Sequence, residues 1–237
     1  MRHGGAIVCV GLMAAMLALT PLAPAAARKV HSVVLGAGRK VPYTKAGDPA
    51  GAAAGEKALT IHALLVDGVR KEWTAGEAHD VTDRSFVVRR AVRINDSLPG
   101  DKQEHWVWQR GPWLLADRAT GHITPLKLAD YDPAASQVSW FRDYAAYCGT
   151  TASGKSLYAV VVQVAARKPL LAKRLGTYDA ANHPDPVCGL PQWQREPMRV
   201  SFQPSGKEAV SFDIVPGSAV LVEDSSDEAE TPDSGPK

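Results

Sequence analysis

The strongest constraint on the fold is the pattern of apolar residues, which alternates with a period of two along much of the chain. Residues 86–94, 198–203 and 210–214 place apolar side chains at every second position, with Arg90 as the exception. Such alternation is typical of β-strands with one buried face, whereas helices place apolar residues three and four positions apart. No stretch after the first 27 residues shows the helical spacing. The sequence therefore predicts an all-β fold built from consecutive antiparallel sheets.

Turn residues indicate where these strands are joined. Asp67-Gly68 separates two expected strands at 59–66 and 69–73, and this dipeptide favours the tight turn of a two-residue hairpin. Residues 157–164 carry apolar side chains on both faces, which is typical of a strand covered on both sides. We expect both segments to lie in antiparallel sheets.

One charged residue interrupts an apolar strand face. Phe86 and Val88 share a face with Arg90 in the 86–94 segment. An unpaired charge on a packed face is costly, so we expect either a carboxylate partner or a side chain that extends to the solvent at an edge. Asp80 and Asp83 are the candidate partners. A functional alternative is an anion-binding site that also uses Arg89 and Arg93, although those two point away from Arg90.

The first 27 residues have the layout of a secretory signal peptide. Arg2 precedes an uncharged, almost wholly apolar run at 6–20, and small residues at 23–27 form two A-x-A cleavage sites. The run of 15 residues is short for a membrane span, although a short uncleaved anchor is an alternative. We expect a periplasmic or secreted protein with no transmembrane segment after cleavage.

Cysteine usage agrees with export. Removal of the signal peptide takes away Cys9 and leaves Cys148 and Cys188, which are 40 positions apart. An even pair in an oxidising compartment is expected to form a disulfide. Two free thiols or half of a metal site are the alternatives, and the absence of a C-x-x-C motif argues against the metal site.

Two further segments have compositions unlike a packed core. Residues 46–57 form a loop rich in glycine and alanine, and residues 223–237 carry six acids and one base, a net charge of −5. The tail is too polar to bury a core and is expected to be disordered. The domain between, 28–222, has 25 bases and 19 acids, a net of +6. The tail either solubilises the protein or folds back on this basic body.

A short internal repeat suggests that part of the chain is built from similar units. The motif W-x-R occurs at Trp108, Trp140 and Trp193, and the last two are each followed by a Ser-Gly-Lys turn at 153–155 and 205–207. Trp140 and Trp193 are 53 residues apart, which is near the length of a four-stranded unit. We expect the three tryptophans to occupy equivalent strand positions.

The segment 140–176 resembles one blade of a β-propeller. It contains a strand ending at 140–141, strands at 144–148 and 157–164, a turn at 153–155 and an outer strand at 168–174. The resemblance implies a four-stranded antiparallel sheet. The match is good over this one blade-like unit only, and the chain lacks the G-H…W-D signature of propeller repeats. The expected architecture is therefore either a partial propeller-like arrangement or a sandwich-like stack.

Few residues suggest chemistry. The chain lacks G-x-S-x-G and H-E-x-x-H motifs, and no catalytic residue or cofactor is predicted. His79, Asp80 and Asp83 form the densest cluster of possible metal ligands, in a segment expected to be a loop. A polar turn that ends a strand is the alternative interpretation of this cluster.

A possible ligand platform comes from aromatic residues. Trp106 and Trp108 share a face if they lie on one strand, and together with Arg90 they could stack on a sugar or an aromatic ligand. Burial in the core is the competing interpretation. The overall charge of +2 argues against a dedicated nucleic-acid binder.

These features lead to one expected function and one alternative. We expect an exported, non-catalytic binding or scaffolding protein of a bacterial cell envelope or of the extracellular space, with a protein or a glycan as its partner. The alternative is an envelope-polymer hydrolase or a metal-dependent enzyme that uses the loop with His79, Asp80 and Asp83.

Overall fold

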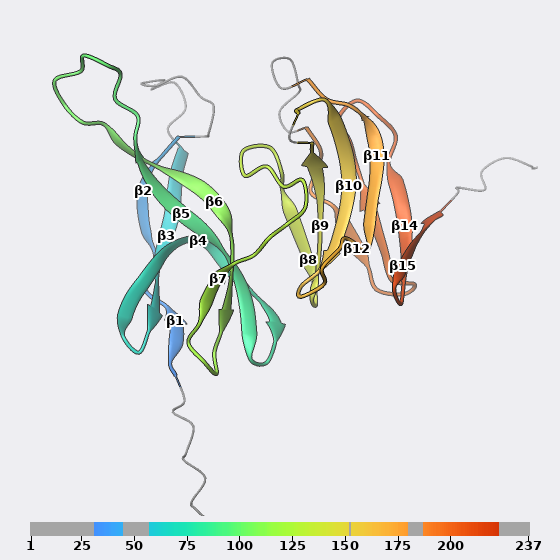
Figure 1. The fold of residues 1–237 in the computed structure, drawn as a ribbon, viewed down its shortest axis with the longest axis horizontal. Helices are drawn as coiled ribbons and strands as arrows, with labels where there is room; N and C mark the ends of the chain where they lie inside the picture. Colours follow the sequence, from blue (N-terminus) through green and yellow to red (C-terminus); the bar gives the residue numbers. More distant parts are fainter. Residues whose placement is uncertain (1–30, 45–56, 152, 180–186, 223–237) are drawn as a thin grey trace, which may run out of the picture.

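The computed structural model describes residues 31–44, 57–151, 153–179 and 187–222. Within them the chain forms two all-β lobes that lie side by side and are joined by residues 126–137 (Figure 1). The prediction of consecutive antiparallel sheets is confirmed. The predicted signal peptide at 1–27, the acidic tail at 223–237 and all but the last residue of the segment 46–57 lie outside the described residues.

The first lobe is a seven-stranded sheet in which five strands close a ring. β3 pairs with β2 and β4, β4 with β5, and β5 with β6, all antiparallel; β6 then returns to β2 in parallel. β1 continues the line of β2 along β3, and β7 pairs with β6. The strands are β1 (Val33–Leu35), β2 (Arg39–Tyr43), β3 (Lys57–Val66), β4 (Val69–Thr82), β5 (Ser85–Asn95), β6 (Trp106–Asp117) and β7 (Ile123–Pro125).

The predicted hairpin at Asp67-Gly68 joins β3 to β4. Both residues have positive φ angles, 51° at Asp67 and 78° at Gly68. A two-residue turn of this kind matches the twist of antiparallel strands, and aspartate followed by glycine tolerates it at little cost. The dipeptide therefore fixes the register of the first hairpin.

Two apolar clusters hold the first lobe together, and β5 contributes to both. One cluster draws on every strand of the ring and consists of Val41, Leu59, Ile61, Ala75, Ala91 and Trp108. The other draws on β1, β3, β5 and β6 and consists of Val33, Leu64, Val66, Phe86, Val88, Leu114 and Ala116. Because Phe86 and Val88 serve one cluster and Ala91 the other, β5 is packed on both faces.

The second lobe consists of two four-stranded antiparallel sheets stacked face to face (Figure 1). One apolar cluster joins them, with Val161 from the first sheet and Phe202 and Phe212 from the second among its buried members. Tyr147 and Val160 on the other face of the first sheet are also buried, under residues of the segment that joins the lobes. The strands are β8 (Val138–Phe141), β9 (Tyr144–Thr150), β10 (Ser156–Gln163) and β11 (Leu171–Thr177), then β12 (Gln192–Gln194), β13 (Arg199–Phe202), β14 (Val210–Val215) and β15 (Ser218–Val222).

The predicted disulfide is present. Cys148 on β9 is bonded to Cys188, which precedes β12, and their Cα atoms are 6.2 Å apart. Both residues are buried in the cluster between the two sheets. The bond therefore crosses the sandwich and ties its two layers together.

The internal repeat is confirmed for two of its three copies. Trp140 and Trp193 lie on β8 and β12, the first strands of the two meanders, and the two Ser-Gly-Lys turns follow the second strands. Trp108 differs, because it lies on β6 in the ring of the first lobe. The blade-like unit expected at 140–176 is observed as β8–β11, and of the two expected architectures the sandwich-like stack is the one that forms.

One ion pair on the second sheet of the second lobe, between β13 and β14, predicts a measurable shift in the pKa of an aspartate. Arg199 donates hydrogen bonds of 2.7 and 3.2 Å to the carboxylate of Asp213 on the neighbouring strand, and these bonds lower the pKa of Asp213. The stabilisation is therefore complete above the ordinary aspartate pKa and is lost as pH falls through the lowered value. Carboxyl NMR should show that Arg199→Gln raises the pKa of Asp213, while Lys173→Gln on β11 should leave it unchanged.

Candidate functional site

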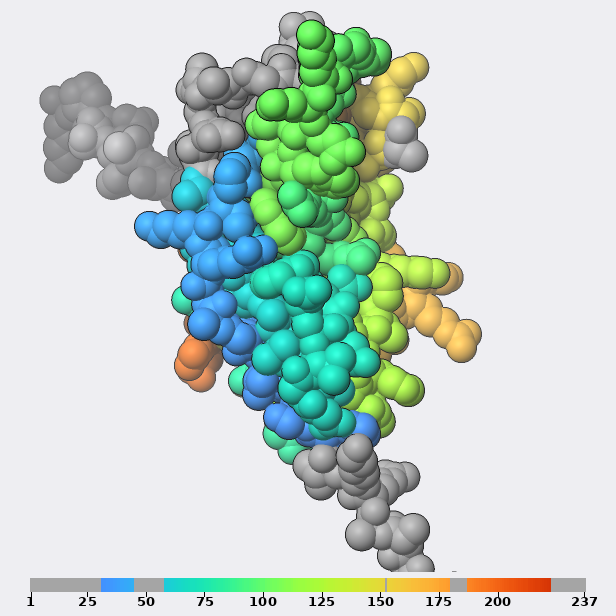
Figure 2. Space-filling view, turned by 90° about the vertical axis from the view of Figure 1, so that its left-hand side faces the viewer, coloured from blue at the N-terminus to red at the C-terminus, as the bar shows by residue number. Residues whose placement is uncertain are grey.

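A groove opens in the first lobe where β4 and β5 move apart. Their pairing reaches Thr74 and Arg90 and is not continued toward the start of β4. Beyond that point, residues 70–73 of β4 and 90–93 of β5 line a groove with a volume of about 610 Å³, together with Arg39 of β2 and Trp108 of β6. Figure 2 views the molecule from the side of this lobe, with β2 in blue and the β3–β4 hairpin in cyan and teal toward the viewer.

Two tryptophans form the base of the groove. The ring centroids of Trp73 and Trp108 are 5.8 Å apart in an edge-to-face arrangement. Trp108 is buried in the apolar cluster to which all five strands of the closed ring contribute (the ring cluster), and Trp73 is half-buried against it. The aromatic base of the groove is therefore part of the packed core of the lobe.

Three arginines lie on the same side of the sheet as these rings. Cross-strand partners share a face, and Arg39 is paired with Ile61 of the ring cluster while Arg93 is paired with Trp108. The guanidinium of Arg39 lies 4.6 Å from the centroid of Trp73, and that of Arg70 lies 5.0 Å from it. Cations over an aromatic face gain from its negative quadrupole, so the tryptophans position the arginines.

The groove has an excess of positive charge. Its lining contains five cations, namely Arg39, Arg70, Lys71, Arg90 and Arg93, and one carboxylate, that of Glu72. Glu72 pairs with Arg90, whose Nε donates to it at 3.0 Å. No carboxylate among the described residues pairs with Arg39, Arg70 or Arg93. The guanidinium groups beside the tryptophans are therefore available to an anionic ligand.

The predicted partners of Arg90 are wrong. The carboxylate that meets Arg90 belongs to Glu72, because the register pairs Thr74 with Arg90 and so places Glu72 diagonally beside it on the same face. The two side chains remain 39% and 27% exposed, so the pair is worth no more than about 1 kcal/mol. Arg90 is thus a wall residue of the groove rather than a buried structural charge.

The expected tryptophan platform is divided between the core and the rim. Trp108 is 7% exposed and lies in the base of the groove, whereas Trp106 is 42% exposed near its edge. The guanidinium of Arg93 lies 4.8 Å from the centroid of Trp106, and the indole N–H of Trp106 donates to Glu104 at 2.8 Å. Arg90, Arg93 and Trp108 all line the groove, with Trp106 beside it.

The structure does not bring His79, Asp80 and Asp83 together. His79 and Asp80 lie within β4, which continues to Thr82, and not in a loop. The ring of His79 stacks on Trp140 and shares a 2.7 Å hydrogen bond with the carbonyl of Arg142, while Asp80 accepts from Arg118 at 2.6 Å. In the part of the chain that the structure describes, no three potential ligands form a metal-binding group. A strand was expected at 69–73 only, and its continuation to Thr82 was missed because the outward residues there are polar.

Arg89 lies where the two lobes meet. Its guanidinium donates to the carbonyls of Gly111 and Pro133 and lies 5.8 Å from the ring of Tyr131. Burial lowers the pKa of Arg89 and raises that of Tyr131. Arg89 therefore anchors the segment that joins the lobes to the first lobe, and it does not line the groove.

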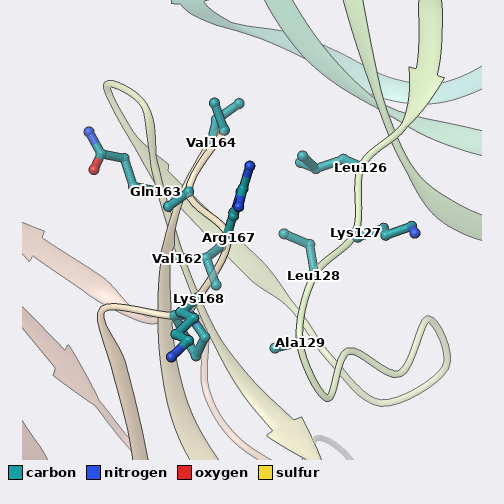
Figure 3. A pocket seen from close by; sticks show the side chains of 12 residues that line it. Leu126, Lys127, Leu128, Ala129, Val162, Gln163, Val164, Arg167 and Lys168 are labelled. Atoms are coloured by element: carbon teal, nitrogen blue, oxygen red, sulfur yellow. The ribbon is translucent and has the colours of Figure 1, made fainter.

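A second cavity lies between the segment joining the lobes and the turn after β10. Figure 3 shows Leu126 and Leu128 directed toward Arg167 and Val162, with Lys127 pointing away. Its volume of about 60 Å³ is well below the roughly 300 Å³ of small ligand sites. It has room for water rather than for a substrate.

Comparison of the chain with protein-family models, with curated proteins and with solved structures gives no match. Among the described residues, no helix is long and apolar enough to cross a membrane. The groove itself therefore carries the functional argument.

Sequence reasoning missed half of the groove. Arg39, Arg70, Lys71 and Trp73 were not identified as candidates, although Arg70-Lys71 follows the Asp-Gly turn after a single residue. Their proximity to Arg93 and Trp108 depends on closure of the ring, which joins strands distant in sequence.

Proposed function

We propose that the chain is an exported, non-catalytic binding protein whose groove between β4 and β5 binds an anionic ligand. The observation that carries the proposal is the set of Arg39, Arg70 and Arg93 on the same face as Trp73 and Trp108, with no carboxylate partner among the described residues. Guanidinium groups bind carboxylates, sulfates and phosphates through paired, charge-assisted hydrogen bonds.

The aromatic base adds a second contribution to binding. An anion that reaches Arg39 comes close to the rings of Trp73 and Trp108, because the guanidinium lies 4.6 and 5.8 Å from their centroids. Part of the ligand can then be shielded from water, and ion pairing is stronger in a shielded site than at an open surface. We therefore expect binding to be weakened by salt without being abolished.

Export is supported by the disulfide. Cys148 and Cys188 are joined in the buried core of the second lobe, and structural disulfides of this kind persist in oxidising compartments. The signal-like sequence at 1–27 points the same way. An envelope or extracellular setting would supply acidic glycans and acidic protein segments as ligands.

Charge reversal in the groove tests the proposal. Binding of heparin and of an acidic peptide to the exported protein should weaken at least about tenfold in Arg93→Glu, because about 1.5–3 kcal/mol of charge-assisted bonding is lost. Arg93 is exposed, so its replacement should leave the melting temperature unchanged. Isothermal titration calorimetry at two salt concentrations, with tryptophan fluorescence as a second readout, would measure both effects.

The matched control is Arg174→Glu on β11. Arg174 is also exposed and lies on the second lobe, outside the groove, so the variant has the same net charge as Arg93→Glu. It should keep nearly wild-type affinity for both probes. Equal losses in the two variants would show that only overall charge matters, and the absence of binding to either probe would overturn the proposed function.

A further inference from the structure

We infer that the ligand of the groove is an extended acidic peptide that binds by adding a strand to the free edge of β5. The inference rests on the proposed function and goes beyond it, because it assigns a class of ligand and a mode of binding. Strand addition uses main-chain hydrogen bonds for affinity and alternate side chains for specificity, and both requirements can be examined in the groove.

The main-chain requirement is met by two strand segments that, within the part of the chain that the structure describes, pair on one side only. Residues 91–95 of β5 pair with β6, and residues 69–72 of β4 pair with β3. The pairing between β4 and β5 covers neither segment. Each segment therefore presents backbone groups toward the groove, where a strand from another molecule can satisfy them.

The side-chain requirement is met by an uneven distribution of charge across the sheet. Arg39 and Arg93 lie on the face of the tryptophan base. The pairing of Arg70 with Leu65, past the irregularity at Leu64/Leu65, is consistent with its contact to Trp73 on that face. Glu72 and Arg90 neutralise each other on the opposite face. Because successive residues of a strand point to opposite faces, acids at every second position would all meet the arginines.

The size of the groove fits a short strand. Its volume of about 610 Å³ lies within the range of roughly 300–1,000 Å³ that is common for ligand sites. Residues 91–95 offer five positions for pairing, a length of about 17 Å at 3.3 Å per residue. A polysaccharide would use the same charges but would have no regular use for the free strand edge.

A second role for the charges must be separated from ligand binding. Lysine and arginine on an edge strand also prevent pairing between identical molecules. Arg93→Glu should therefore be measured by size-exclusion chromatography as well. If its only effect is self-association, with unchanged affinity for the probe, the arginine protects the edge and the inference is wrong.

Backbone methylation of the probe tests strand addition directly. The probe is a capped ten-residue peptide alternating glutamate and threonine, compared with two isomers that are N-methylated at all glutamates or at all threonines. Charge is the same in all three, but each isomer loses the amide donors of one edge. We expect at least one isomer to bind tenfold or more weakly than the parent peptide. Hydrogen exchange should show slower exchange at residues 91–95 when the parent peptide is bound.

The outcomes distinguish this inference from the proposed function. Equal binding of the parent and both isomers, with no protection at 91–95, would overturn strand addition and leave an anion-binding groove. Binding of heparin but not of the peptide, abolished by Arg93→Glu, would identify a polysaccharide ligand and likewise overturn the inference. Binding of neither probe would remove the proposed function itself.

Discussion

Loss of the Cys148–Cys188 disulfide is expected to destabilise the protein by about 4 kcal/mol, because the bond closes a long loop in the unfolded chain. The two cysteines are 40 residues apart and are bonded across the sandwich. A domain of ordinary stability unfolds with about 5–15 kcal/mol, so this change is a large fraction of the total. The double variant Cys148→Ala/Cys188→Ala should melt about 8–16 °C below the wild type.

Comparison with the reduced wild type separates the bond from the packing of the side chains. Both cysteines are buried, with 4% and 3% exposure, so the alanine variant also loses some contacts in the core. The reduced protein keeps both sulfur atoms and should still lose most of the stability. Chemical denaturation with and without reductant would measure the difference, and equal midpoints would show that the bond does not stabilise this fold.

Local patterns in the sequence predicted the second lobe better than the first. The apolar run of β10, the Ser-Gly-Lys turns and the positions of Trp140 and Trp193 all describe strands that pair with their nearest neighbours in the chain. Such meanders depend on alternation and turn chemistry, which are visible in the sequence. The face-to-face stack of the two sheets also follows from their apolar inner faces.

The ring of the first lobe could not be predicted in the same way. Its closure depends on the parallel contact between Tyr43 of β2 and Trp108 of β6, which are 65 positions apart. Bulges in β4 and β6 also reverse which residues point inward, as the register shifts beside Leu64 and Arg89 show. The wrong partner of Arg90 has a separate cause: residues 79–82 belong to β4, and the register places Asp80 opposite Phe86 and Thr74 opposite Arg90.

The groove was only partly foreseen for the same physical reason. Arg90, Trp106 and Trp108 were singled out because they interrupt or enrich a local pattern, whereas Arg39 and Arg70 look like ordinary surface residues in the sequence. They become part of a site only because the closed ring of strands β2–β6 brings them over the indole of Trp73. Residues whose role depends on long-range pairing carry no local signal.

Replacing Trp140 by alanine is expected to cost about 3–5 kcal/mol, as is usual for large aromatic side chains packed among others. The indole lies between the lobes, where its centroid is 5.6 Å from that of His79 and 5.1 Å from that of Trp113. It also packs against the cluster around Tyr147 and Val160. Its removal should therefore lower the melting temperature and speed proteolytic cleavage in the segment 126–137.

Trp140→Phe provides the matched control for this variant. The indole N–H of Trp140 is buried and has no acceptor among the described residues, and an unsatisfied buried donor itself costs about 1–3 kcal/mol. Phenylalanine keeps an aromatic ring against His79 and Trp113 and removes that donor, so it should lose less than half as much stability as alanine. Equal losses in the two variants would mean that the N–H makes a necessary hydrogen bond. Wild-type cleavage of the segment 126–137 in Trp140→Ala would show instead that the lobes are held by other contacts, with Arg89 and its bonds to Gly111 and Pro133 as the next residues to replace.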